Sequence, residues 1–345
     1  MTWTVGPTNS LVDVAGVRVG HYTRTDDGWL TGTTVVRLPV DGAVAGVDVR
    51  GGGPGTRETD LLDPRNLVER VHAICLSGGS AFGLAAADGV MSALLTDGVG
   101  FPMGGPGEVV PIVPGAVIFD LGRGGVFANR PDSSFGAAAY AAATDAAVAQ
   151  GCVGAGTGAK AGGIKGGIGS ASTVLADGTT VAALVVVNAV GSCVDPRTGH
   201  LYAVSLGFPG EFPEVGPIDP ERLAQARARA AEEVGPLKPA LATTIGVIAT
   251  DATLTKAQCA KVSGIGHDGL ARAIRPVHTM FDGDTLFTVA TGARGADAAP
   301  DPFAFHALLD AAGDTVTRAV GHAMLAATSV HPPARTIRSY RDALL

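Results

Sequence analysis

Three groups of polar residues lie in loops or at the ends of predicted strands, where side chains can take part in chemistry. Thr243, the first of two adjacent threonines, opens a strand after a charged, proline-rich connector. Asp282 and Asp284 flank a glycine in the run HTMFDGDT. Asn188 interrupts the apolar run VVVNAV, and Lys165 lies in a glycine-rich loop. A hydroxyl with two carboxylates fits acyl transfer, in which one carboxylate orients the nucleophile and the other supports it.

Each of these groups also has a simpler interpretation. Asp-Gly favours a hairpin turn, in which both carboxylates would be solvated. The pair could also ligate a hard cation, although a dedicated calcium loop needs more oxygen ligands than this stretch supplies. A buried amide must find hydrogen-bond partners, so Asn188 either joins neighbouring segments in a structural role or is a site residue. We expect structural roles for His72, His267 and His278.

The first half of the chain predicts strands and helices that could position these groups. Short β-branched runs between glycine turns predict strands, and alanine-rich windows predict helices. The predicted strands are 16–22, 32–38, 43–49 and 71–76, and the predicted helices are 61–69, 80–95 and 134–149. The helix at 80–95 directly follows a strand and a Gly-Gly turn. That arrangement either presents free N–H groups to an anion or is a tight connection only.

The second half continues this irregular alternation. Predicted strands are 181–189, 243–250 and 284–290, and predicted helices are the middle of 217–239, then 256–274 and 302–328. The block 151–172 holds nine glycines. Its Gly-x-Gly spacing suggests a dinucleotide site, but more glycine follows where that motif needs a helix, and no Gly-Lys-Ser/Thr follows. We therefore expect a layered α and β protein without a nucleotide cofactor.

Composition excludes several classes of protein. Of 345 residues, 46% are hydrophobic, and the net charge of -7 is spread along the chain, which excludes disorder and disfavours nucleic-acid binding. The four cysteines lie far apart without metal-ligand spacing, as expected for reduced thiols in a cytosolic protein without a metal site. The first residues lack an export signal, and the longest apolar run falls short of the ~20 residues of a membrane helix. We expect a soluble cytoplasmic protein.

Several long motifs resemble one known family. The stretch 243–292, which begins TTIGVIATDATLTKAQCAKVSGIGHDG and ends HTMFDGDTLFTVATG, closely resembles the DmpA family of self-processing amide hydrolases. That family includes L-aminopeptidase/D-amidase-esterases, β-aminopeptidases and the nylon-oligomer hydrolase. The likeness continues through VDVRGGGPGTRETDLL, CLSGGSAFGL, GAVIFDLG, IKGGIGSAS and VVVNAVG, so it covers nearly the whole chain.

The resemblance implies a fold and an activity. The fold is a four-layer α/β/β/α sandwich over residues 1–345, shared with ornithine acetyltransferases and similar to N-terminal-nucleophile hydrolases. Family members are usually homotetramers or larger, so a homo-oligomer is expected. The implied activity is that of a peptidase or amidase on small peptides or amides, through an acyl-enzyme, with no metal or cofactor.

The resemblance also implies a cleavage site. Precursors of the family cut themselves immediately before a Thr or Ser, which then becomes the nucleophile. The matching bond joins Ala242 to Thr243, so that cleavage would give fragments 1–242 and 243–345. The free α-amine created there has a pKa near ~7.7 to 8.0, suited to a general base.

The remaining site residues follow by the same matching. Asp282 and Asp284 match the acidic or polar pair that hydrogen-bonds the nucleophile. Asn188 matches an amide that stabilises the oxyanion, and Lys165 matches a lysine near the site. These assignments come from the family motifs and not from the spacing of the residues.

The sequence departs from its relatives at three positions. Ala242 stands where close relatives commonly carry Asn, Phe119 where some members have an oxyanion tyrosine, and Val117 where β-aminopeptidases have a glutamate for the substrate ammonium. Two alternatives therefore accompany the hydrolase. One is an acyl transferase of the ornithine-acetyltransferase type, and the other is an uncleaved, inactive precursor or binding module.

Overall fold

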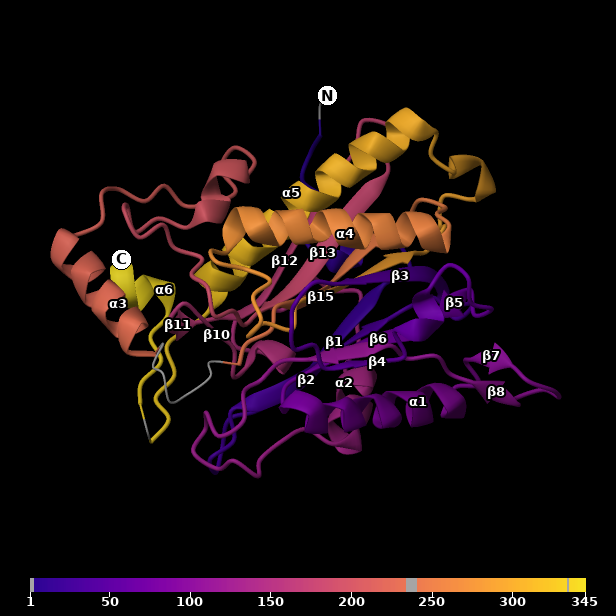
Figure 1. Cartoon of the computed structure of the whole chain (residues 1–345). Helices are drawn as coiled ribbons and strands as arrows, with labels where there is room; N and C mark the ends of the chain where they lie inside the picture. The colour runs from indigo at the N-terminus through magenta and orange to yellow at the C-terminus, as the bar shows by residue number, and fades with distance from the viewer. Residues whose placement is uncertain (1–2, 234–240, 334) are drawn as a thin grey trace.

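Two β-sheets pack face to face, and helices cover the outer face of each, which gives an α/β/β/α sandwich (Figure 1). The computed structural model describes residues 3–233, 241–333 and 335–345. Helices α1 (Ala86–Thr96) and α2 (Ser133–Ala141) cover the first sheet, whereas α4 (Lys256–Ala273) and α5 (Pro302–Ala326) cover the second. The four-layer fold expected from the resemblance is therefore confirmed.

The two sheets contain eleven of the strands in the described part of the chain. The first sheet has the order β1 (Arg18–Arg24), β2 (Thr31–Arg37), β6 (Ala73–Ser77), β9 (Gly115–Val117), β4 (Thr56–Arg57). The second has the order β12 (Gly167–Val174), β13 (Thr180–Val187), β14 (Ile245–Thr250), β15 (Thr285–Ala290), β3 (Ala43–Val49), β5 (Arg70–Val71). The small hairpins are β7 (Phe101–Pro102) with β8 (Val109–Val110), and β10 (Lys160–Ala161) with β11 (Ile164–Lys165).

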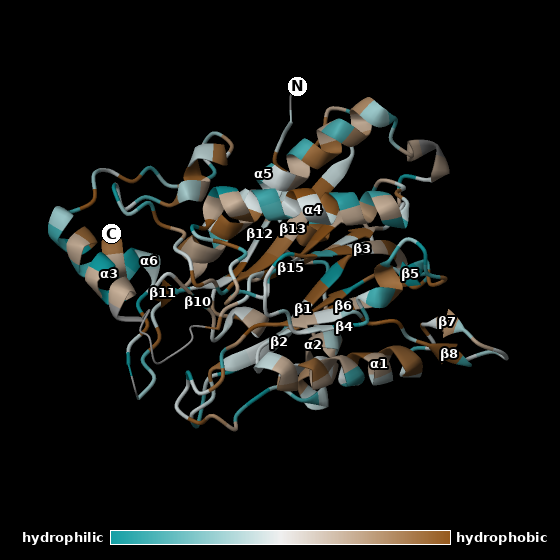
Figure 2. Cartoon of the chain, viewed as in Figure 1, coloured by the Kyte–Doolittle hydropathy of each residue, from teal (hydrophilic) through white to brown (hydrophobic). Residues whose placement is uncertain are grey.

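The unbroken apolar sequence of β13 follows from burial on both of its faces. Leu184 and Val186 point into the core between the sheets, where Phe287 of β15 also lies. Val185 and Val187 point the other way, toward α4 and α5. Figure 2 shows hydrophobic residues along these strands, whereas the helices alternate hydrophobic and polar residues.

Glycine allows the helices of the second sheet to approach the strands closely. A Cβ at Gly46 of β3 would lie 2.3 Å from the main-chain nitrogen of Ala260 in α4. A Cβ at Gly169 of β12 would lie 2.0 Å from the carbonyl oxygen of Ala319 in α5. Larger residues would push both helices off the sheet.

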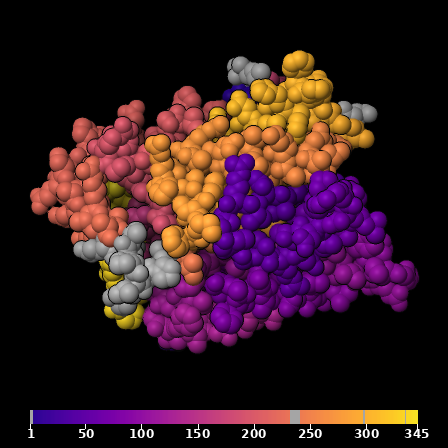
Figure 3. All heavy atoms as spheres, in the orientation of Figure 1, coloured from indigo at the N-terminus to yellow at the C-terminus, as the bar shows by residue number. Residues whose placement is uncertain are grey.

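The C-terminal third of the chain is interleaved with the remainder. Its strands β14 and β15 lie between β13 and β3, its helix α4 lies over β15 and β3, and its helix α5 lies over β12 and β13. The space-filling view shows this orange and yellow part packed against the indigo and purple N-terminal part (Figure 3). Helices α3 (Pro220–Glu233) and α6 (Tyr340–Leu344) contact each other beside the sandwich.

The helix predicted over 134–149 was wrong in its second half. Helix α2 ends at Ala141, and the following segment runs along the edge of the first sheet. There Val19 and Thr144 exchange two main-chain hydrogen bonds, of 2.9 and 3.1 Å. Pairing with an otherwise open strand edge outweighs the helix propensity of the alanines.

Three smaller predictions also need correction. The helix at 61–69 is only a 3₁₀ turn, Asp60–Leu62, followed closely by a proline. The strand at 71–76 divides at His72, where the chain crosses from the second sheet to the first. The helix at 80–95 begins as a 3₁₀ segment, Ser80–Ala85. The predicted helix within 217–239 is α3, and residues 234–240 lie outside the described residues.

The other predicted elements are confirmed with small shifts of their ends. Helix α4 starts at its predicted cap, because the Thr255 side chain accepts a hydrogen bond from the main chain of Gln258. The short 3₁₀ segments elsewhere are Leu11–Asp13, Gly154–Gly156, Tyr202–Leu206 and Ala296–Ala298. Among the described helices, none combines the length and the apolar character needed to cross a bilayer.

Candidate active site

The topology of the second sheet brings the predicted site residues to one edge. Strands β14 and β15 are parallel neighbours, so their N-terminal ends meet. Thr243 precedes β14, and Asp282 and Asp284 precede β15. Strand β13 is antiparallel to β14, so Asn188, which follows it, lies at the same edge. Lys165 reaches this edge just before β12, which is antiparallel to β13.

Thr243 lies at the centre of this group and is 5% exposed. Its hydroxyl Oγ1 donates to the carbonyl oxygen of Ala242 over 2.5 Å. The same oxygen accepts the Gly283 N–H over 3.1 Å, and the Ala242 N–H donates to the Phe281 carbonyl over 3.0 Å. The Thr243 N–H donates to the main-chain carbonyl of Asn188 over 2.5 Å. The peptide group before Thr243 is therefore held by hydrogen bonds on both sides.

The carboxylate of Asp284 fixes the chain next to Thr243 and is fully buried. Its Oδ1 accepts the Thr244 N–H over 2.7 Å. Its Oδ2 accepts two hydrogen bonds from His278, from the main-chain N–H over 3.0 Å and from the ring Nδ1 over 2.8 Å. Such burial excludes a solvated hairpin turn.

Asp282 is also buried, at 1% exposed, but it faces different partners. Its Oδ1 accepts the Val190 N–H over 3.2 Å. Its Oδ2 accepts the main-chain N–H and the hydroxyl of Thr279, over 3.1 and 2.6 Å. Burial raises the pKa of Asp282 above the usual aspartate value, and the negative charge of Asp284 adds to this shift. No hydrogen bond among the described residues joins either carboxylate to the Thr243 hydroxyl.

His278, for which the sequence predicted a structural role, contacts one of the predicted site residues, Asp284. Its main chain has a positive φ of 57°, an uncommon conformation for a non-glycine residue, and its ring packs edge-on against His267 at 4.7 Å. Burial lowers the pKa of His267 to about 4, so that this neighbour is uncharged near neutral pH. Only the short spacing between His278 and the acidic pair hinted at the contact. His72, by contrast, accepts the Ile112 N–H away from this edge.

The amide of Asn188 is fully buried and has one satisfied end. Its Oδ1 accepts hydrogen bonds from Arg123 Nη1 over 2.6 Å and from the main-chain N–H of Lys160 over 3.1 Å. Its Nδ2 has no hydrogen-bond partner among the described residues. Asn188 therefore carries an unused side-chain donor, and its main-chain carbonyl binds the Thr243 N–H.

Lys165 lies within the glycine-rich loop, and its ammonium group is fully buried. Its Nζ donates to the carbonyl oxygens of Gly156 and Gly166 over 2.9 and 2.8 Å. Burial lowers the pKa of Lys165 to about 8. None of the described hydrogen bonds joins Lys165 to Thr243.

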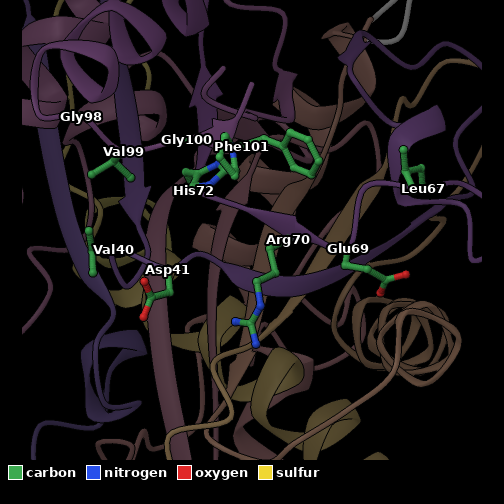
Figure 4. Close-up of a pocket in the computed structure, with 11 residues that line it drawn as sticks. Val40, Asp41, Leu67, Glu69, Arg70, His72, Gly98, Val99, Gly100 and Phe101 are labelled. Atoms are coloured by element: carbon green, nitrogen blue, oxygen red, sulfur yellow. The ribbon is translucent and has the colours of Figure 1, made fainter. Parts of the chain in front are cut away.

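The described residues hold no group of three or more His, Cys, Asp or Glu side chains able to bind a metal ion. A cavity of about 490 Å³ lies elsewhere, lined by Val40, Leu67, Arg70 and His72 among others (Figure 4). It lies before the start of β3, whereas the polar edge lies beyond the end of that seven-residue strand, about 20 Å away. No predicted site residue lines that cavity.

Comparison with known proteins shows the family of this chain. The model of peptidase family S58 matches residues 9–337. The chain belongs to this family. An uncharacterized aminopeptidase of Mycobacterium leprae (strain TN) is 51% identical over 351 residues, 96% of this chain and 94% of the relative. A 6-aminohexanoate-oligomer endohydrolase of Paenarthrobacter ureafaciens is 33% identical over 290 residues, 81% of this chain and 74% of the relative.

Solved structures of S58-like peptidases share the fold. A β-aminopeptidase of a Burkholderia species superposes with a TM-score of 0.74 at 24% identity, covering 99% of this chain and 95% of the other. The L-aminopeptidase D-Ala-esterase/amidase of Ochrobactrum anthropi gives 0.72 at 19% identity, covering 98% and 93%, and is described as a variant of the Ntn-hydrolase fold. The S58 chain is accordingly a hydrolase of a peptidase family, as the resemblance implied, and its fold is the one that this N-terminal-nucleophile variant shares.

Proposed function

We propose that this S58 peptidase cleaves itself between Ala242 and Thr243 and then uses Thr243 as the nucleophile on small peptides or amides. One observation carries the proposal. The Thr243 hydroxyl lies 2.5 Å from the carbonyl oxygen of Ala242, and the Gly283 N–H donates to that same oxygen over 3.1 Å. A nucleophile and a donor for developing negative charge therefore meet at the peptide group that must break.

The cleavage step follows from this arrangement. Thr243 Oγ1 attacks the carbonyl carbon of Ala242 and loses its proton, while the carbonyl oxygen gains negative charge opposite the Gly283 N–H. Collapse breaks the carbon–nitrogen bond, the nitrogen takes up a proton, and an ester joins Ala242 to the Thr243 oxygen. Water then hydrolyses the ester to a carboxylate at Ala242 and a free hydroxyl and α-amine at Thr243.

The same groups serve a substrate after cleavage. The new α-amine remains beside the Asn188 carbonyl, which accepts the Thr243 N–H in the intact chain, and it acts as the general base for the hydroxyl. Thr243 Oγ1 attacks the substrate carbonyl carbon, whose oxygen faces the Asn188 amide, and gives its proton to the α-amine. The carbon–nitrogen bond of the substrate then breaks, the leaving amine takes up that proton, and water hydrolyses the ester left on Thr243. Phe119 has no hydroxyl, so the Gly283 N–H supplies the second donor.

The acidic pair positions this machinery. Asp284 holds the main chain of Thr244, and Asp282 joins the 188–190 segment to the 279–284 loop through Val190 and Thr279. Both carboxylates thus fix the two segments between which the Thr243 hydroxyl lies. Loss of either negative charge would loosen the alignment of nucleophile and carbonyl.

Ala242 itself indicates how the acyl side of a substrate binds. In the intact chain Ala242 pairs with Asp282 as a parallel bridge, through the Phe281 carbonyl and the Gly283 N–H. A substrate residue with a free N–H next to its scissile carbonyl can make the same two bonds once Ala242 has left. This supports peptides and related amides as the substrate class. We further propose a cytoplasmic location, as expected from the sequence, and a homo-oligomer, as the family resemblance implies.

Intact mass and amide turnover test the proposal together. The wild-type chain should yield fragments of 1–242 and 243–345, Thr243→Ala should remain whole and inactive, and Thr243→Ser should retain cleavage. A mature N-terminus at any other residue, or full turnover by Thr243→Ala, would overturn the assignment. Turnover that depends on an added amine acceptor would instead identify an acyl transferase.

A further inference from the structure

We infer that Arg123 is a positioning residue, which fixes the orientation of the Asn188 amide so that its Nδ2 donor faces the reacting carbonyl. The inference rests on the proposed function, in which that amide stabilises the oxyanion. Arg123 lies in the loop after β9, four residues beyond Phe119. No family motif on which the resemblance was based includes it.

Hydrogen bonding decides which way the Asn188 amide points. Its oxygen accepts two donors, Arg123 Nη1 over 2.6 Å and the Lys160 N–H over 3.1 Å. Rotation of the amide by 180° would place its NH₂ group against both of these donors, with no acceptor for any of them. Only the observed orientation satisfies Arg123 and Lys160 together.

This orientation leaves the other end of the amide as an unused donor. Nδ2 is buried without a partner among the described residues, which is unfavourable unless a ligand or reaction intermediate completes the bond. The Asn188 main-chain carbonyl binds the Thr243 N–H over 2.5 Å, so the unused donor belongs to a residue in direct contact with the nucleophile. An unpartnered donor at this position is suited to developing negative charge.

Arg123 is itself held in place. Its Nη1 also donates to the Gly158 carbonyl over 2.6 Å, and its main-chain N–H binds the Asp120 carbonyl over 3.2 Å. The buried Asp120 carboxylate accepts the Gly79 N–H over 2.7 Å. The guanidinium is therefore fixed before it orients Asn188. Because Phe119 supplies no hydroxyl, the rate depends strongly on this one side-chain amide.

A double-mutant cycle tests the inference on protein that has already cleaved itself. Arg123→Met should lower kcat by ~10-fold to 10²-fold with little change in KM, as expected for a misaligned oxyanion donor. Asn188→Ala should lower kcat by ~10² or more. Adding Arg123→Met to Asn188→Ala should not lower kcat further, because Arg123 acts through Asn188. Arg130→Met, at an arginine that stacks on Phe82, is the control and should keep wild-type kcat.

Three results would overturn the inference: an unchanged kcat in Arg123→Met, additive losses in the double variant, or a loss confined to KM. If Arg123→Met does not fold or cleave itself, the same double-mutant cycle with Arg123→Lys tests whether Arg123 positions Asn188. Lysine keeps the charge but presents one donor group in place of a fork, so partial retention of kcat is expected. Failure of the proposed function is a separate result, since it would appear as turnover by Thr243→Ala.

Discussion

A single methyl group at position 283 provides a direct test of the proposed cleavage geometry. Gly283 lies between the two aspartates, and its main-chain N–H donates to the Ala242 carbonyl oxygen. In Gly283→Ala the new Cβ would lie 2.9 Å from Thr243 Oγ1 and 2.5 Å from the carbonyl oxygen of Gly53. The backbone φ of Gly283 is not in the left-handed region, so alanine itself causes no local strain. The substitution therefore acts by crowding the nucleophile.

The size of the effect follows from these distances. An ordinary contact begins at 3.4 Å, so the hydroxyl must move by about 0.5 Å, the difference between 3.4 and 2.9 Å. A misplacement of about 1 Å can cost ~10² in rate, so half of that displacement predicts at least ~10-fold slower self-cleavage. The contact with Gly53 should also destabilise the fold by about 1–3 kcal/mol, as overpacking does.

Denaturing gels over a time course measure the cleavage, and thermal melting measures the stability. Gly53→Ala is the matched control, because its Cβ would lie 3.9 Å from the nearest atom, the carbonyl oxygen of Asp282. It introduces the same methyl group beside the same loop without crowding Thr243. Wild-type cleavage kinetics in a folded Gly283→Ala variant would refute the idea that the hydroxyl attacks from the observed position.

Four further predictions concern the buried polar groups of the site. Asp282→Asn and Asp284→Asn should each lower amide turnover by ~10² or more on cleaved protein, and wild-type turnover in both would contradict their role. Because burial raises the pKa of Asp282, kcat should fall at acid pH with an apparent pKa above the usual aspartate value, and this fall should disappear in Asp282→Asn. An unchanged pH profile in Asp282→Asn would show that another group causes the fall. Turnover should fall further in His278→Ala than in His278→Asn, because the asparagine amide can still donate to Asp284. Equal losses in the two variants would show that the hydrogen bond from the His278 ring does not position Asp284. Burial lowers the pKa of Lys165 to about 8 from 10.5, so the unfolded chain binds more protons between these values and stability should rise with pH there. Urea unfolding should show a smaller rise in Lys165→Met, and an identical rise would contradict this.

Local sequence patterns predicted most strands and helices because their burial is strong and continuous. The run VAALVVV of β13 is apolar on both faces because it lies between two layers of core. Helix α2 shows where the patterns fail. The alanines after Ala141 favour a helix, but the hydrogen bonds between Val19 and Thr144 are contacts over more than a hundred residues that no local window contains.

The sequence predicted which residues form the candidate site, but it could not predict how their side chains are oriented. Family motifs identified Thr243 and Asn188, yet the orientation of the amide depends on Arg123, which is 65 residues away in the sequence. The short spacing between His278 and Asp284 hinted at a contact but could not predict its geometry, because a positive φ at His278 and a tight turn bring Nδ1 against the carboxylate. The contact between Arg123 and Asn188 joins the loop after β9 of the first sheet to the end of β13 of the second, so it depends on how the two sheets pack.

In the proposed self-cleavage, the position of Thr243 just before β14 separates the bond that would be cut from the hydrogen bonds that hold the fold. Strand β14 pairs with β13 on one side and with β15 on the other, so its ladders anchor fragment 243–345 at the centre of the sheet. Ala242, on the other side of the scissile bond, is tied to this edge by its bonds to Phe281 and Gly283. Cleavage therefore breaks no ladder of the six-stranded sheet. If the chain cleaves there as proposed, the departing end would release only a few hydrogen bonds, and the vacated site would retain the Thr243 hydroxyl, the Gly283 N–H and the Asn188 amide.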